Sequence, residues 1–256
     1  MRGIMPAMQR AGRLWTWQAF AGLAALLLCA PGRAAPPQPL VLLVETSAPL
    51  PHARIEGDRV VEGLNLDIGR ALARRLGREL VAEPTPRKRL AEALQRGEGD
   101  MLCDYQSDWL PGDFAWSRPF IPDQALLVTA ATVPAPGKLV AVDGQPVGTV
   151  RGYVYPEMSA LLRSGFRRDD APDAVTNLRK LARGRVNHAL TGRRVLEYEQ
   201  RIGQFNLALH PPLVVSQVLA QCALSPRSTV SLAALNKAIQ GLVSEGELAR
   251  LMARYR

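Results

Sequence analysis

Polar and aromatic side chains follow directly on short apolar runs at three places in the chain. They are Glu45 and Ser47, then Asp104 and Tyr105, then Arg151, Gly152 and Tyr153. Carboxylates and guanidinium groups make directional, charge-assisted hydrogen bonds, and aromatic rings supply flat apolar walls. Together these residue types are typical of a pocket for a small polar molecule. Arg151 precedes an expected helix start, where charge and free backbone N–H groups both favour an anion.

Three more residues are candidates for lining the same pocket. Arg89 lies in an expected helix after Pro86, and Trp109 and Trp116 follow Tyr105 closely. Aromatic residues make up only 5% of the chain, so their local density is informative. Each candidate also has a plainer interpretation. Trp116 fits core or hinge packing, Arg89 fits a solvated surface arginine, and the loop residues fit solvent-facing positions.

The sequence contains none of the common catalytic signatures. It has no Gly-x-Ser-x-Gly elbow, no His-Glu-x-x-His and no phosphate loop with Gly-Lys-Ser/Thr. The three histidines, His52, His188 and His210, lack metal-ligand spacing and are assigned to surface or loop positions. Cys103 lies in an apolar run, which argues against a catalytic thiol. We therefore expect a binding protein rather than an enzyme, with no cofactor and no metal.

The elements that must position these residues alternate along the chain. Apolar runs at 40–44, 79–82 and 100–103 predict strands, and Leu64, Ile68, Leu72 and Leu76, at every fourth position, predict a helix. A second cycle has expected strands at 125–130, 146–150, 186–190 and 214–224, and expected helices at 156–163, 173–182 and 193–201. This pattern predicts an α/β protein with doubly wound sheets in two lobes. Ligands of such sheets bind beyond the carboxyl ends of the strands.

The first 34 residues are typical of a secretory signal peptide. Basic residues precede an apolar stretch from Leu14 to Ala30, and small residues then lead to a cleavage site after Ala34. A retained anchor helix and a lipoprotein signal at Cys29 are the alternatives. Export to the periplasm predicts an oxidising compartment, so Cys103 and Cys222 are expected to form a disulfide rather than two buried thiols. The formal net charge of +9 is spread along the chain and does not favour nucleic acid.

Six segments, in order, resemble family 3 of the extracellular solute-binding proteins, the periplasmic receptors of amino-acid-type ABC importers. They are Gly63-Leu-Asn-Leu-Asp67-Ile68, Leu94-Gln-Arg-Gly97-Glu-Gly-Asp100, Trp116-Ser117-Arg-Pro119-Phe120, Val147-Gly148-Thr-Val-Arg151-Gly152, Leu181-Ala-Arg-Gly184-Arg185-Val186 and Leu235-Asn236-Lys-Ala238-Ile239. The resemblance implies a type II periplasmic-binding-protein fold with a two-strand hinge. It divides the chain into a signal peptide at 1–34, lobe 1 at 35–123 and 217–256, and lobe 2 at 124–216.

The resemblance also implies a function and partners. The lobes would close around a small-molecule ligand, and an ABC permease in the inner membrane would recognise the closed monomer. The alternatives are a lyase-like periplasmic enzyme on the same scaffold, with Glu45 or Asp104 as acid or base, and a ligand sensor for a membrane kinase. In the family, the strand ending near Cys103 lies beside the returning strand with Cys222, which supports the disulfide.

The departures from the family pattern bear on the ligand. The usual carboxylate-binding threonine and arginine fall at Ser107 and Leu110. The usual ammonium-binding acid falls at Asn187 or Gly192. We therefore expect a small polar or anionic ligand rather than an ordinary α-amino acid. Aromatic walls and Arg151 would hold it, with Asn187 in the pocket and Arg89 or Arg151 as a displaced arginine.

Overall fold

A computed structural model describes residues 38–256, and Pro37–Arg256 forms one compact unit. The predicted signal peptide, residues 1–34, lies outside the described residues. Within the described part of the chain, no helix is long and apolar enough to cross a membrane.

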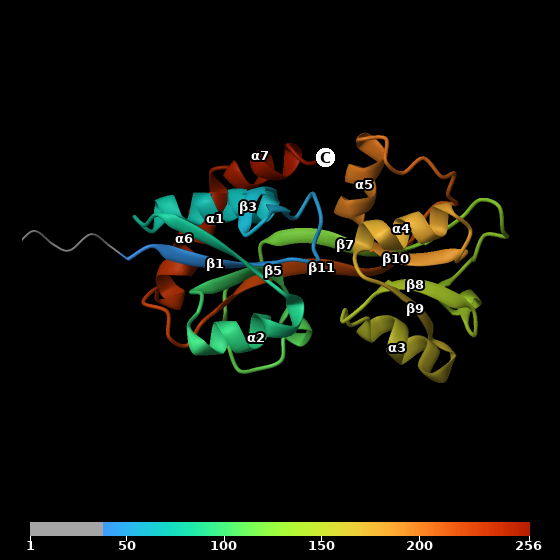
Figure 1. The fold of residues 1–256 in the computed structure, drawn as a ribbon, viewed down its shortest axis with the longest axis horizontal. Coiled ribbons are helices and arrows are strands. Elements are labelled where there is room, and N and C mark those ends of the chain that lie inside the picture. Colours follow the sequence, from blue (N-terminus) through green and yellow to red (C-terminus); the bar gives the residue numbers. More distant parts are fainter. Residues whose placement is uncertain (1–37) are drawn as a thin grey trace, which may run out of the picture. The chain divides into compact units, whose positions relative to one another are not determined.

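The first lobe contains a parallel sheet that an antiparallel strand extends (Figure 1). Its strands run in the order β4-β1-β5-β11, and their bounds are β4 Leu80–Thr85, β1 Leu40–Glu45, β5 Met101–Tyr105 and β11 Leu213–Leu224. Four helices cover the sheet: α1 Leu64–Arg75, α2 Arg87–Arg96, α6 Leu232–Ser244 and α7 Glu247–Ala253. Successive residues of β1 point to opposite faces, so Leu42 packs with Ile68 of α1 whereas Leu43 packs with Leu90 of α2.

The second lobe has the same layered construction. It contains β7 Ile121–Thr129, β10 His188–Gly192, β8 Pro146–Val150 and β9 Arg167–Ala171, in that order across the sheet. Its helices are α3 Pro156–Leu162, α4 Ala174–Ala182 and α5 Arg193–Arg201. In Figure 1, α4 and α5 lie on one side of these strands and α3 on the other. The smaller elements are β2 Arg54–Glu56, β3 Arg59–Glu62, β6 Ala115–Trp116 and the 3₁₀ turns Ser107–Trp109, Leu139–Val142 and Arg163–Gly165.

Two long antiparallel strands, β7 and β11, connect the lobes (Figure 1). Their pairing runs from Leu213 opposite Leu127 to Ala220 opposite Ile121, and it includes Val218 opposite Asp123. The predicted type II fold with a two-strand hinge is therefore confirmed. The lobe boundaries after residue 123 and before residue 217 fall within this strand pair and remain a prediction.

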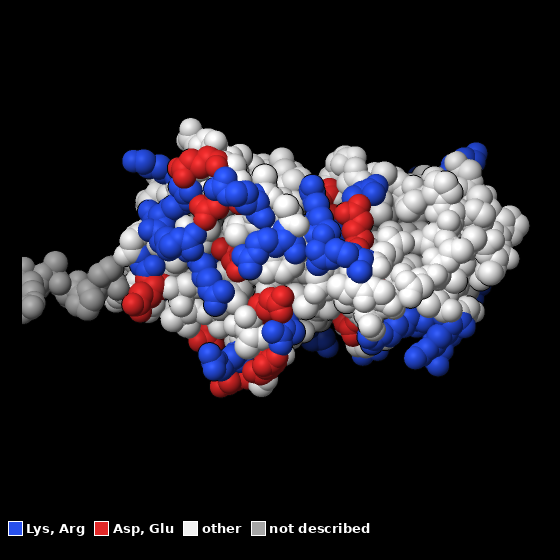
Figure 2. Space-filling model, turned by 90° about the horizontal axis from the view of Figure 1, so that it is seen from above, with Lys and Arg blue, Asp and Glu red and all other residues white. Residues whose placement is uncertain are grey.

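The C-terminal helices are held on lobe 1 by charged side chains. Figure 2 shows basic and acidic groups interspersed over the face that carries α1 and α7. Arg75 of α1 lies 2.7 Å from both Glu245 and Glu247, and the Tyr255 hydroxyl donates to Asp67 at 2.8 Å. These contacts fix the end of the chain against α1.

The predicted disulfide is present. Cys103 of β5 and Cys222 of β11 are register partners in the antiparallel pair, and the bond joins them across a sequence separation of 119. The alternative of two buried thiols is therefore wrong.

Strand β9 was not predicted from the sequence. The segment Arg167–Ala171 pairs in parallel with β8 at the edge of the sheet, although four of its five residues are charged. An edge strand with solvent on one side needs no apolar alternation, so hydrophobic periodicity cannot reveal it. The predicted strand at 186–190 also begins two residues later, at His188, whose buried side chain bonds Thr129 and Gln145 rather than lying on the surface.

Candidate functional site

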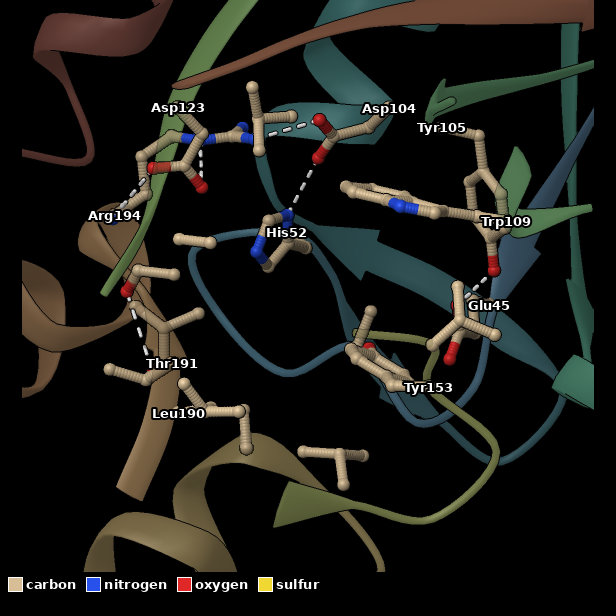
Figure 3. Close-up of a pocket in the computed structure, with 18 of the residues that line it drawn as sticks. Glu45, His52, Asp104, Tyr105, Trp109, Asp123, Tyr153, Leu190, Thr191 and Arg194 are labelled. Atoms are coloured by element: carbon tan, nitrogen blue, oxygen red, sulfur yellow. Dashed lines mark hydrogen bonds and ion pairs between the residues drawn. The ribbon is translucent and has the colours of Figure 1, made fainter. Parts of the chain in front are cut away.

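A cavity of about 160 Å³ lies between the lobes, where the carboxyl ends of β1, β5 and β10 meet the hinge strands (Figure 3). Seven charged or ionisable groups line it: Glu45, His52, Arg87, Asp104, Asp123, Glu157 and Arg194. The aromatic rings of Tyr105, Trp109, Tyr153 and Tyr155 complete the wall. This position matches the expectation that ligands bind beyond the strand ends.

The first group of contacts centres on Glu45. This residue ends β1 and is only 3% exposed. The Tyr105 and Ser47 hydroxyls both donate to its carboxylate, and Arg87 Nη1 donates to Oε2 at 3.0 Å. Burial and the nearby Glu45 carboxylate raise the pKa of both Tyr105 and Tyr153 well above the usual value. Both phenols therefore stay neutral and can donate hydrogen bonds at physiological pH.

Arg87 connects this group to lobe 2. It is the first residue of α2, and its Nε donates to the Gly152 carbonyl at 2.9 Å. Its guanidinium carbon lies 4.4 Å from the centre of the Tyr153 ring and 5.4 Å from that of Tyr105. Arg87 thus contacts a carboxylate and a ring in lobe 1, and a carbonyl and a ring in lobe 2.

The second group centres on Asp104, at the end of β5. Arg194 Nη2 of α5 donates to its Oδ1 at 2.7 Å, and His52 Nδ1 lies 2.8 Å from its Oδ2 (Figure 3). Arg194 also places Nε 3.0 Å from Asp123 Oδ2 in the hinge. Burial opposes ionisation of Asp104, but Arg194 and His52 outweigh it and hold the pKa of this carboxyl well below its usual range. Asp104 is therefore ionised.

The backbone around this group is unusual at two positions. Asp104 has φ of 66°, in the left-handed region that non-glycine residues seldom occupy and that often marks functional sites. Gly63 has φ of 127°, and a Cβ there would lie 2.3 Å from the His52 carbonyl oxygen. Glycine therefore allows the chain at His52 to approach the start of α1, where the Asn65 N–H donates to that carbonyl at 3.0 Å. This close approach positions His52 beside Asp104.

Five of the residues predicted from the sequence line the cavity: Glu45, Asp104, Tyr105, Trp109 and Tyr153. Trp109 packs edge to face with Tyr105, with ring centres 6.3 Å apart. Ser47 and Gly152 do not line the cavity, but each bonds a residue that does. The Ser47 hydroxyl donates to Glu45, and the Gly152 carbonyl accepts from Arg87.

The other four predicted residues lie outside the cavity. Arg89 and Arg151 are exposed, and Trp116 packs in the core beneath α2. Arg89 lies two residues after Arg87, which turns it about 200° around the helix and away from the strand ends. Asn187 is exposed at the amino end of β10, whereas the carboxyl end at Gly192 lines the cavity.

The cavity also contains groups that sequence reasoning missed. Arg89 and Arg151, the two candidates for a displaced arginine, do not line the cavity, whereas Arg87 and Arg194 do. His52, assigned to a surface or loop position from its sequence, lies in a turn and is half-buried against Asp104. Arg194 lies two residues after the end of β10, and this position at a strand end could have identified it as a site residue from the sequence. Within residues 38–256, no group of three or more His, Cys, Asp or Glu side chains could hold a metal ion.

Two α/β lobes joined by two strands, with a cavity between them lined from both sides, define a type II periplasmic-binding-protein fold. Residues 40–256 match the family described as bacterial extracellular solute-binding proteins, family 3, and the chain belongs to this family.

Solved structures with the same fold have low sequence identity. An ancestral arginine-binding protein bound to arginine is 17% identical with a TM-score of 0.69, covering 85% of this chain and 97% of its own. A double mutant of the Bordetella pertussis BvgS VFT2 domain is 19% identical with a TM-score of 0.69, covering 85% and 93%. The ancestral amino-acid-binding protein AncCDT-1, a precursor of cyclohexadienyl dehydratase, is 13% identical with a TM-score of 0.69, covering 85% and 95%. No curated protein sequence matches this chain.

Proposed function

We propose that this protein is a periplasmic solute receptor whose two lobes close around a small polar ligand and present it to an ABC permease. The observation that carries the proposal is the interlobe cavity, in which a charged side chain from each lobe contacts a residue of the opposite lobe. Arg87 extends from lobe 1 to Gly152, and Arg194 extends from lobe 2 to Asp104. The protein would act as a monomer, since one chain supplies both walls of the cavity.

The proposed ligand contacts are those that the cavity brings together. Glu45, Asp104, Tyr105, Trp109 and Tyr153 come from the predicted set, and Arg87 and Arg194 join them. Arg151 and Asn187 no longer belong to the proposed site. The structural neighbours include proteins bound to arginine, to glutamine and to L-glutamate, and a ligand of that size suits a cavity of about 160 Å³.

A sensor role is the second candidate. The periplasmic BvgS VFT2 domain shares the fold with a TM-score of 0.67, and closure around a ligand would serve a sensor as well as a receptor. The lyase-like alternative is weaker. Asp104, one of its two candidates for the acid or base, is ionised and has no proton to give near neutral pH, and Arg194 and His52 occupy both of its oxygens, so neither is free to act as a base.

A thermal-shift screen of the exported protein against a metabolite panel tests the proposal. A ligand that binds only the folded state at 100 times its Kd stabilises that state by about 2.7 kcal/mol. Any hit is then titrated by calorimetry against Arg87→Ala and against Arg89→Ala as a matched control. Arg87→Ala should weaken binding at least about tenfold, because it removes the hydrogen bond from Arg87 to the Gly152 carbonyl that joins the closed lobes, whereas Arg89→Ala should not. Equal effects of the two substitutions would place the site elsewhere.

Receptor and sensor are separated by their partners. A receptor for uptake should co-purify with a permease from inner membranes only when ligand is present. Co-purification with a membrane kinase instead would support the sensor.

A further inference from the structure

The charges that line the cavity are unequal in number. Three buried carboxylates, Glu45, Asp104 and Asp123, face two guanidinium groups, Arg87 and Arg194. The exposed Glu157 adds a fourth carboxylate at the rim. The four carboxylates outnumber the two guanidinium groups and His52 together, so the cavity carries an excess of negative charge.

Both guanidinium groups are already committed to the protein's own carboxylates. Arg87 pairs with Glu45 at 3.0 Å, and Arg194 pairs with Asp104 at 2.7 Å and with Asp123 at 3.0 Å. Two nitrogens of Arg194, Nε and Nη1, are covered and make no hydrogen bond among residues 38–256, and of these only Nε lies in an ion pair, with Asp123. A ligand carboxylate that reached Nη1 would stand beside Asp104 and Asp123 and be repelled by both. A neutral hydroxyl or carbonyl oxygen would not meet this repulsion.

The aromatic rings point to the same ligand charge. Arg87 lies over the ring of Tyr153, but no cation in the described part of the chain lies over the indole of Trp109. Indole is the strongest cation–π acceptor among side chains. Trp109 packs against Tyr105, whose hydroxyl donates to Glu45, and it lines the same cavity as Asp104, so a cation on this ring would share the cavity with buried carboxylates.

We propose that Asp104 and Asp123, by occupying Arg194, make the cavity selective for a carboxylate-free organic cation over the corresponding amino acid. The inference rests on the proposed receptor function and assigns its ligand class. Asp104 takes the position at the guanidinium that a ligand carboxylate would need. The two aspartates are therefore specificity determinants as well as parts of the contact between the lobes.

Matched pairs of ligands that differ only by a carboxylate test this proposal. Calorimetry is done with cadaverine against lysine and with agmatine against arginine, on the exported full chain. In each pair the amine should bind at least about tenfold more tightly. Asp104→Asn should lower this ratio at least about tenfold, because it removes one negative charge and frees Arg194 Nη2 for a ligand carboxylate. Asparagine tolerates the left-handed backbone at this position, so the substitution preserves the turn.

The control is Asp58→Asn, which makes the same charge change in the exposed β2–β3 turn and should leave the ratio unchanged. If Asp104→Asn does not fold by circular dichroism, Asp123→Asn repeats the test on the other carboxylate of Arg194. Tighter binding of lysine and arginine than of their amines overturns the proposal, and so does an unchanged ratio in Asp104→Asn. If neither amine binds but a neutral or anionic compound shifts the melting temperature, the ligand class is wrong and the receptor function stands. If no compound in the panel binds, the receptor function itself loses its support.

Discussion

The disulfide between Cys103 and Cys222 allows a stability prediction worked from the fold. The bond joins β5 to β11, which are register partners, and it closes a loop of 119 residues that contains all of lobe 2. Both cysteines are buried, with 2% and 0% exposure. The double substitution Cys103→Ala/Cys222→Ala removes the bond and leaves the hydrogen bonds between the strands in place. Its effect should therefore arise mainly from the greater freedom of the unfolded chain.

The loop length sets the magnitude. The chain-entropy relation for a separation of 119 residues gives about 4.9 kcal/mol at 25 °C. This is the upper end of the expectation, since measured disulfides contribute roughly 2–5 kcal/mol. Loss of two sulfur atoms from the core adds a smaller cost, because each leaves a cavity of about one atom.

Urea unfolding followed by circular dichroism provides the measurement. The oxidised protein should lose 2–5 kcal/mol of unfolding free energy on double substitution, by the range typical of disulfides. In a reducing agent the two proteins should converge, leaving only the difference due to the small cavities. An equal midpoint for the oxidised wild type and the double variant would refute the reasoning, because the bond would then not restrict the unfolded chain enough to affect stability.

Three further substitutions have defined outcomes. Arg194 and His52 lower the pKa of Asp104. The stability that this carboxylate contributes is therefore present above its unfolded pKa of about 3.9 and is lost as pH falls below that value. Asp104→Asn should flatten the fall in the urea midpoint between pH 5 and pH 3. Burial lowers the pKa of His188, so stability should decrease as pH falls below about 6.5, and His188→Gln should remove that decrease between pH 7.5 and pH 5.5. Asp173 caps α4 by accepting from the Thr176 N–H at 2.7 Å, and Asp173→Ala should cost about 1 kcal/mol in urea unfolding, with the exposed Asp108→Ala as a control.

Periodicity in the sequence was sufficient to predict most of the fold. Leucine or isoleucine at every fourth position predicted α1, and apolar runs predicted β1, β5 and β11 within one or two residues. Helix α1 is visible because one face of it is buried, whereas β1 and β5 are buried on both faces and therefore read as continuous apolar runs. The strand β9 has charged residues at four of its five positions, since it lies at a sheet edge, and this pattern carries no periodic signal.

The site was only partly predictable, because its contacts join residues that are distant in the sequence. The rule that ligands bind at strand ends correctly located Glu45, Asp104 and Tyr105 at the cavity. The same rule does not tell which of two nearby arginines faces inward. Arg87 and Arg89 are two residues apart, and the first turn of α2 alone decides that Arg87 reaches Glu45. The pairing of Asp104 with Arg194 spans 90 residues and depends on how closely the lobes approach.

Each of the two cavity arginines lies in the first turn of a helix that begins at a strand end, one in each lobe. Arg87 is the first residue of α2, which follows β4, and Arg194 is the second residue of α5, which follows β10. Helical side chains lean toward the amino end of their helix, so a long side chain in the first turn extends back over the strand end and across the cleft. Each arginine therefore contacts the opposite lobe, at Gly152 and at Asp104 respectively. The protein's own carboxylates neutralise both arginines, so contact between the lobes needs no anionic ligand. The proposed ligand has to match the negative charge that remains in the cavity.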